Sequence, residues 1–181
     1  MTEKYKSVSL DRTAAELVAV MGEQRLESVV ARLKEKNLTV ATAESCTGGL
    51  VGKLLTDVSG VSAVYLGGVI SYTNQIKTDV LGVRAETIEK YTEVSVQTAI
   101  EMAERVRENF SSDIGVSVTG FAGPGGGNDN DPVGTVYIAV ATKDGTRPLR
   151  LSLEPDSDRA EIRRVSAHVI LAMLEKIIAG I

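Results

Sequence analysis

A chain of 181 residues with 43% hydrophobic and 24% charged residues is typical of a globular protein, and its length predicts one domain with a sizeable core. The net charge of −4 gives no electrostatic reason to expect a nucleic acid or an anionic membrane as a partner. With Cys46 as the only cysteine and His168 as the only histidine, the composition excludes an intrachain disulfide framework, a His/Cys zinc site and catalysis by two histidines.

The amino-terminal region carries no targeting signal that the sequence reveals. Residues 1–12 lack the apolar core of a secretory signal, and no stretch reaches the roughly 20 apolar residues that span a bilayer. We therefore expect a cytoplasmic protein. The first ten residues are predicted to be loose, and helical spacing of apolar residues predicts an amphipathic helix, or two, over about 11–36.

Short β-branched runs and segments of helical periodicity alternate along the rest of the chain. The predicted strands span about 38–42, 64–72, 114–119, 134–141 and 149–153. The predicted helices begin near Leu50, after Asn74 and Ser95 as expected N-caps, and at about Asp158, with Gly82 ending the second of them. Alternation of strands and helices predicts parallel crossovers, whereas the last two strands are expected to form a hairpin around 143–145. These elements predict a single three-layer α/β/α domain with a mixed, mainly parallel sheet.

A serine lies between the first predicted strand and the helix that follows it, in the sequence Glu44-Ser45-Cys46-Thr47-Gly48-Gly49. Open α/β sheets bind ligands beyond the carboxyl ends of their strands, and the amides of a helix amino terminus can hold an oxyanion there. Ser45 is therefore placed like a nucleophile. The alternative is that Ser45 and Thr47 only cap the helix. Cys46 is a rival nucleophile, although a lone cysteine is more often a small buried hydrophobe.

Tyr72 and Lys77 follow the next predicted strand and are expected at the same edge of the sheet as Ser45. A lysine in the first turn of a helix meets the positive end of the helix dipole, which together with desolvation lowers its pKa toward that of a general base. Because the chain has one histidine, a Ser–Lys pair is the most economical way to activate a serine here. The alternative is an ordinary solvated lysine.

A glycine-rich stretch, residues 117–127, joins the third and fourth predicted strands. Its backbone can approach a ligand closely and form an anion nest, but it matches neither the Walker A loop nor G-x-G-x-x-G, and a flexible turn is the alternative. Asp129, Asn130 and Asp131 raise a metal hypothesis, which a solvated loop explains as well. Arg159, in the first turn of the last helix, could bind a phosphate or lie on the surface, and His168 is expected on that helix as a surface or packing residue.

Taken together and in this order, these stretches resemble the carboxy-terminal domain of the competence-damage-inducible CinA family, whose stand-alone members are nicotinamide-nucleotide amidases. The most specific matches are residues 43–49, residues 66–74 with Lys77, and residues 119–126. The resemblance covers about 25–178, so we expect an extension and helix over 1–24 and an amidase domain over 25–181. Where the family has Gly-Asp-Arg, this chain has Ser157-Asp158-Arg159.

The resemblance implies hydrolysis of the carboxamide of nicotinamide mononucleotide to nicotinate mononucleotide and ammonia, a step of pyridine-nucleotide recycling. By similarity, Ser45 attacks the amide carbon, Lys77 takes its proton, and Tyr72 relays or orients that proton between them. Backbone amides near Cys46 and Thr47 would hold the oxyanion. This chemistry needs neither a metal nor a redox cofactor, so no cofactor is expected.

The resemblance also implies where the substrate binds. The expected contacts are Glu44, Cys46, Thr47 and Gly48 around the nucleophile, Thr119, Gly120 and Gly123 around the nucleotide, and Arg159 at its phosphate. A pyridine nucleotide is thus the expected partner, and a homo-oligomer the expected state. Larger members carry a further nucleotide-hydrolysing domain, for which 181 residues leave no room. The alternative is a catalytically silent ligand-binding or partner-regulating module of the same fold, for which Ser157 is the one hint.

Overall fold

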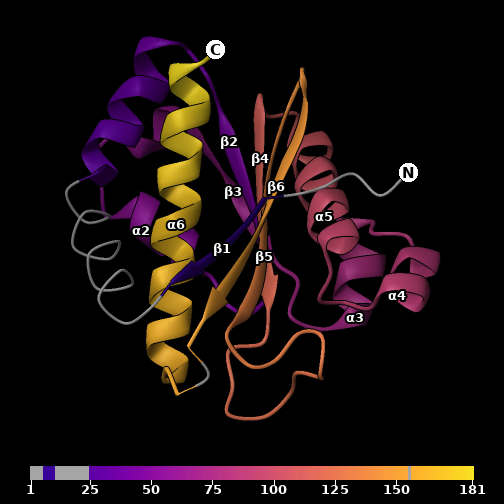
Figure 1. Cartoon of the computed structure of the whole chain (residues 1–181). Coiled ribbons are helices and arrows are strands. Elements are labelled where there is room, and N and C mark those ends of the chain that lie inside the picture. Colours follow the sequence, from indigo (N-terminus) through magenta and orange to yellow (C-terminus); the bar gives the residue numbers. More distant parts are fainter. Residues whose placement is uncertain (1–5, 11–24, 155) are drawn as a thin grey trace.

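One six-stranded sheet forms the centre of the molecule (Figure 1). The structure, a computed structural model, describes residues 6–10, 25–154 and 156–181. In the order β1-β6-β5-β4-β2-β3, the strands are β1 (Lys6–Leu10), β6 (Gly145–Leu153), β5 (Thr135–Thr142), β4 (Ile114–Gly120), β2 (Val40–Glu44) and β3 (Tyr65–Ile70). β2 pairs in parallel with β3 and β4, and β1 in parallel with β6, whereas β5 runs antiparallel to β4 and β6. The predicted mixed, mainly parallel sheet and its hairpin are confirmed.

Helices cover both faces of this sheet, so the predicted three-layer architecture is also confirmed (Figure 1). One face carries the helix through residues 25–35 together with α2 (Leu50–Thr56) and α6 (Arg159–Ala179). The other carries α3 (Asn74–Ile76), the π-helix η2 (Lys77–Leu81), α4 (Ala85–Tyr91) and α5 (Val96–Asn109), and a short 3-10 turn, η1 (Val61–Ala63), precedes β3. The largest apolar cluster lies between the sheet and the first of these helical layers.

β2 is the strand that places the candidate nucleophile. All five of its residues are buried, because it lies between two parallel neighbours and is covered by helices on both faces. The chain leaves β2 for β3 through α2 on one face, and it reaches β4 through α5 on the other face. The carboxyl end of β2 is therefore a topological switch point, the place where open α/β sheets bind their ligands.

Three expectations about the elements were wrong or incomplete. Residues 6–10 were expected to be loose, but they form the edge strand β1, whose side chains are largely exposed and whose order comes from backbone pairing with β6. α4 was not predicted, since only Thr87 of this short helix is buried and it carries almost no apolar periodicity. β6 begins at Gly145 rather than 149. The part of the first predicted helix over 11–24 lies outside the described residues.

Capping groups fix where the helices begin. Ser95 accepts a hydrogen bond from the Thr98 amide and caps α5 as predicted, and Asp158 likewise caps α6 through the Glu161 amide. Asn74 was expected to cap the helix after β3, but Thr73 does so instead. That helix continues as the π-helix η2, which ends at Gly82 as predicted.

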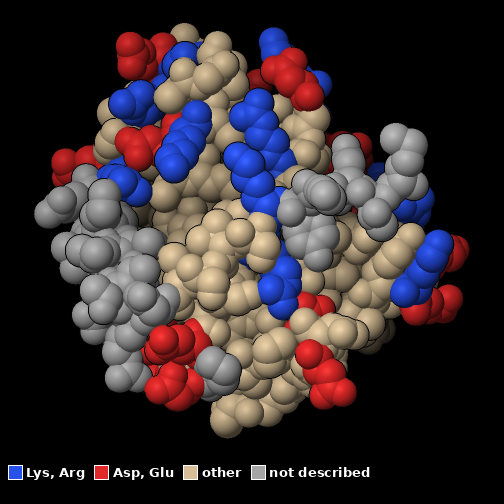
Figure 2. Space-filling model, viewed as in Figure 1, with Lys and Arg blue, Asp and Glu red and all other residues tan. Residues whose placement is uncertain are grey.

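Charged residues of both signs share the face seen in Figure 2, where lysines and arginines are interspersed with acidic side chains. Such mixing accords with the small net charge of −4. Among the described residues, no helix combines the length and the apolar character that crossing a membrane requires.

Candidate active site

The site is built at the carboxyl edge of the sheet, where β2 and β3 end side by side. Ser45 directly follows β2, and its amide donates to the Val118 carbonyl of β4. Ser71 directly follows β3, and its amide donates to the Glu44 carbonyl at the end of β2. Because parallel neighbours end at one edge, these backbone bonds bring the segment that carries Lys77 up to the Ser45 turn.

Lys77 and Ser45 are in direct contact. The Lys77 Nζ lies 3.0 Å from the Ser45 Oγ and donates a second hydrogen bond of 2.8 Å to the Ser71 carbonyl. Lys77 is the first residue of the π-helix η2, so the wider helical turn begins where the amine is positioned. The structure thus brings together two of the three residues expected to be catalytic, thirty-two positions apart in sequence.

Burial changes the acidity of the Lys77 amine. The side chain is 1% exposed, and desolvation lowers its pKa from the usual value of a lysine, because burial disfavours the charged form. The negative charge of Glu93 opposes this shift in part. A buried amine with a lowered pKa, in contact with a hydroxyl, has the properties of a general base.

Glu44 holds the helix that follows the nucleophile. Its carboxylate is 3% exposed and accepts hydrogen bonds from the amides of Gly49, Val51 and Gly52, at distances of 2.8 to 3.0 Å. These amides were expected to be open to an anion, and Glu44 was expected to contact the substrate. The structure corrects the first expectation, because a carboxylate of the protein itself already occupies the amino terminus of α2. The contact of Glu44 with the substrate stays a prediction.

We expect Glu44→Gln to lower the free energy of unfolding by about 3 kcal/mol, because the new amide group would turn a donor toward backbone donors in a buried place. Urea unfolding followed by circular dichroism measures the change. Glu86→Gln is the matched control, since Glu86 lies exposed in the first turn of α4 and its replacement should cost less than about 0.5 kcal/mol. If both substitutions lowered the free energy of unfolding equally, the hydrogen bonds of Glu44 to the amides of α2 would not be important for stability.

Two backbone amides beside the nucleophile are not engaged by other described residues, and that of Cys46 faces its own thiol. Within the part of the chain that the structure describes, the amides of Cys46 and Thr47 donate to no other residue, whereas that of Gly48 donates to the Ser45 carbonyl. Gly48, with φ of +59°, turns the chain there without the strain that a side chain would meet. The amides of Cys46 and Thr47 are the two amides that were expected to hold an oxyanion.

The structure argues against both alternatives for this turn. Neither Ser45 nor Thr47 caps α2, whose N-cap residue is Gly49 and has no side-chain cap bond. Cys46 is buried, and desolvation raises the pKa of its thiol to about 12. A thiol that stays protonated is a poor nucleophile, so Ser45 is the better candidate.

Tyr72 and Arg159 meet at the mouth of the site. The guanidinium of Arg159 donates to the Tyr72 hydroxyl at 2.9 Å and to the Gly123 carbonyl at 2.7 Å, and Tyr72 is 56% exposed. Tyr72 therefore does not lie between Ser45 and Lys77, where a proton relay would place it. Arg159 forms no ion pair with any described residue, so its charge is open to an anion.

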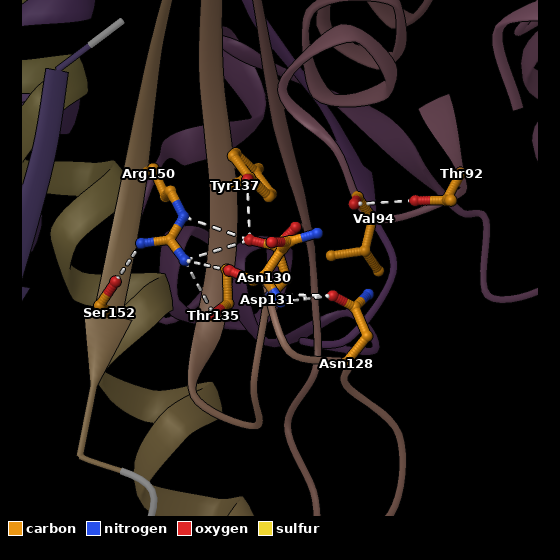
Figure 3. Close-up of polar contacts among 9 residues, drawn as sticks. All are labelled: Thr92, Val94, Asn128, Asn130, Asp131, Thr135, Tyr137, Arg150 and Ser152. Carbon is orange, nitrogen blue, oxygen red and sulfur yellow. Dashed lines mark hydrogen bonds and ion pairs between the residues drawn. The ribbon is translucent and has the colours of Figure 1, made fainter. Parts of the chain in front are cut away.

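The loop that joins β4 and β5 is tied to the sheet at Asp131, four residues beyond the glycine-rich stretch. Asp131 accepts hydrogen bonds from the Tyr137 hydroxyl and the Arg150 guanidinium, which ties the loop to β5 and β6 (Figure 3). Thr119 donates to the Glu93 carbonyl instead of lining an open cradle. A β-carbon at Gly120 would lie 2.7 Å from a carbonyl of β5, so this glycine serves strand packing.

The remaining expectations concern a metal and the histidine. Among the described residues, no three His, Cys, Asp or Glu side chains gather where they could hold a metal ion, and Asp131 is bound to Arg150. His168 is buried in α6, as a packing residue would be. Sequence reasoning missed Arg163, which donates to the Thr47 carbonyl and whose only signal was its place four residues after Arg159.

Comparison with known proteins gives one consistent result. A family model described as the CinA C-terminal domain matches residues 23–178. A CinA-like protein of Kosmotoga olearia is 43% identical over 162 residues, which is 89% of this chain and 39% of the relative. A CinA-like protein of Cytophaga hutchinsonii is 47% identical over 144 residues, which is 80% of this chain and 34% of that relative. The chain thus spans less than two fifths of the length of these curated relatives.

Solved structures agree with the sequence comparison. The crystal structure of the competence/damage inducible protein CihA from Agrobacterium tumefaciens superposes with a TM-score of 0.81 at 38% identity, covering 84% of this chain and 93% of that one. A CinA superfamily protein from Klebsiella pneumoniae superposes with a TM-score of 0.84 at 29% identity, covering 88% of this chain and 99% of that one. The fold and the sequence therefore point to the same set of relatives.

Proposed function

Because the chain belongs to the CinA C-terminal domain family, we propose that it hydrolyses the carboxamide of nicotinamide mononucleotide, releasing nicotinate mononucleotide and ammonia. The observation that carries the proposal is the buried Lys77 amine, with its lowered pKa, 3.0 Å from the Ser45 hydroxyl. A serine paired with such a base is suited to acyl transfer from an amide. The sequence resemblance supplies the substrate.

The acylation step uses the Lys77 amine in its neutral form. One N–H of the amine donates to the Ser71 carbonyl, and its lone pair accepts the proton of Ser45 as the Oγ attacks the amide carbon. The negative charge that develops on the carbonyl oxygen is stabilised by the free amides of Cys46 and Thr47. The ammonium of Lys77 then returns a proton to the leaving nitrogen, so ammonia departs and an ester to Ser45 remains.

Deacylation repeats these roles with water as the nucleophile. The neutral Lys77 amine takes a proton from water, whose oxygen attacks the ester carbon, and the ammonium gives that proton to Ser45 as the acid product leaves. The resting pair is restored after one turnover. Tyr72, whose hydroxyl accepts a hydrogen bond from Arg159, takes no proton in this cycle.

Arg159 is the residue proposed to bind the phosphate of the substrate. In the structure its guanidinium contacts two neutral acceptors, a carbonyl and a hydroxyl, and no described carboxylate neutralises it. A phosphate dianion is a stronger acceptor than either and matches the planar guanidinium with two parallel bonds. Because Arg159 also contacts the Gly123 carbonyl, the proposed phosphate site would lie next to the glycine-rich stretch.

Ammonia release from nicotinamide mononucleotide tests the proposal directly. The purified chain is incubated with the mononucleotide, with and without a chelator, beside the Ser45→Ala variant. Release that survives the chelator and disappears in the variant supports a serine amidase that needs no metal. Binding of the mononucleotide by the folded protein without release of ammonia would favour the silent ligand-binding module instead.

We expect Arg159→Met to raise KM for the mononucleotide by roughly 10- to 100-fold, because one charge-assisted contact with the phosphate is lost. Nicotinamide riboside, which has no phosphate, is the matched control, and its KM should change little. Steady-state kinetics on both substrates give the comparison. An equal rise for both would show that Arg159 acts on the loop rather than on the phosphate.

A further inference from the structure

The turn that carries the nucleophile is held from two sides. On one side, the Glu44 carboxylate accepts hydrogen bonds from amides of α2. On the other side, Arg163 of α6 donates from Nη2 to the Thr47 carbonyl at 2.8 Å, across 116 positions of sequence. A β-carbon built on Gly48 would lie 3.5 Å from the same Nη2, so the guanidinium packs directly against the turn.

Arg163 contacts a backbone carbonyl and no carboxylate among the described residues. Arg84, Arg105 and Arg150 each pair with a carboxylate, whereas Arg163 forms no ion pair within the described ranges. Its Nε is buried and has no partner, and neither has the Thr47 Oγ1. Buried polar groups are nearly always paired, so these two atoms beside the nucleophile turn call for an explanation.

The neighbours of Arg163 connect it with the reaction. The carbonyl that it binds belongs to Thr47, whose amide is one of the two free donors next to Ser45. Arg159 lies one helical turn earlier on the same face of α6 and reaches the mouth of the site. The same helix face therefore presents one guanidinium to the entrance and a second to the nucleophile turn.

We propose that Arg163 is a positioning residue for the oxyanion, which acts by anchoring the Thr47 carbonyl, and with it the peptide that joins Thr47 to Gly48, so that the turn holds the Cys46 and Thr47 amides toward the reacting oxygen. The inference rests on the proposed serine chemistry but not on the identity of the substrate. Its positive charge beside the turn adds a favourable field for the developing anion. Loss of Arg163 leaves Ser45, Lys77 and the phosphate contact in place, so the effect falls on the chemical step.

Labelling of Ser45 by a fluorophosphonate measures this role without any pyridine nucleotide, because the reagent needs an activated serine and donors for its phosphoryl oxygen. We expect Arg163→Met to slow labelling by roughly 10- to 100-fold and to lower kcat for the mononucleotide similarly, with KM changed less than about 3-fold. Arg163→Lys keeps the positive charge and a donor, so its labelling rate should lie between those of the wild type and Arg163→Met. Arg164→Met, on the next residue of α6, is the matched control and should label like the wild type.

The outcomes separate the two proposals. If the wild type is labelled at Ser45 but releases no ammonia, the substrate is wrong and the role of Arg163 is still tested by the labelling rates. If Arg163→Met is folded by circular dichroism and is labelled as fast as the wild type, the positioning role is refuted. If Arg163→Met does not fold, the labelling rate of Arg163→Lys is used instead. A rate for Arg163→Lys equal to that of the wild type would also refute the positioning role.

Discussion

Replacing Ser45 by alanine is expected to lower kcat/KM for nicotinamide mononucleotide by about 10⁴-fold or more, because among the described residues the Ser45 hydroxyl is the one nucleophilic side chain that the Lys77 amine hydrogen-bonds. The folded state should persist, since the change removes one hydroxyl whose hydrogen bond is to Lys77. Ammonia release with the pure variant gives the rate, and circular dichroism checks the fold.

Cys46→Ala is the matched control for that experiment. Cys46 directly follows Ser45, but burial raises the pKa of its thiol to about 12. The activity of Cys46→Ala should therefore stay within about 3-fold of the wild type. An active Ser45→Ala enzyme beside an inactive Cys46→Ala enzyme would reverse the assignment and make the cysteine the nucleophile.

Lys77→Met should lower kcat by about 10³- to 10⁴-fold while leaving the fold intact, because methionine fills a similar volume and removes only the amine. Lys53→Met is the control, since Lys53 lies exposed on α2 and pairs with Asp57 there. The double variant Ser45→Ala/Lys77→Met should be no slower than Ser45→Ala alone, because the two residues act as one unit. A further loss in the double variant would mean that Lys77 acts independently of Ser45.

The pH dependence of the wild type follows from the same lysine. Only the neutral amine accepts a proton, so kcat/KM should rise with pH and level off above the pKa of Lys77. Because burial lowers that pKa, the rise should occur below the range of an ordinary lysine. Activity that is constant from mildly acidic to alkaline pH would count against Lys77 as the base.

Burial explains which parts of the fold could be predicted from the sequence. β2 and α5 are buried along their length or along one face, so their apolar patterns are unambiguous. β1 has no such pattern, because its residues are exposed at the edge of the sheet and the strand is specified by the backbone of β6. α4 is short and buries only Thr87, which gives no periodic signal.

The sequence predicts those parts of the candidate site that depend only on the order of the strands. Ser45 and Lys77 follow consecutive parallel strands, so their meeting at one edge can be inferred from the alternation of elements. The contact between Arg159 and Tyr72 depends on a helix eighty-seven residues further along, whose placement no local pattern gives. The Glu44 carboxylate folds back onto the helix that follows it, and only the three-dimensional structure shows that it takes the amides expected to be free.

The shielded thiol of Cys46 has a consequence for how the protein withstands oxidants. Burial raises the pKa of this thiol to about 12, so the reactive thiolate is scarce at neutral pH, and the side chain is shielded from solvent as well. Peroxides and alkylating reagents attack the thiolate, so this residue should react far more slowly than an exposed cysteine. The only cysteine of the chain should therefore be a slow site of oxidation and alkylation, although it directly follows the candidate nucleophile.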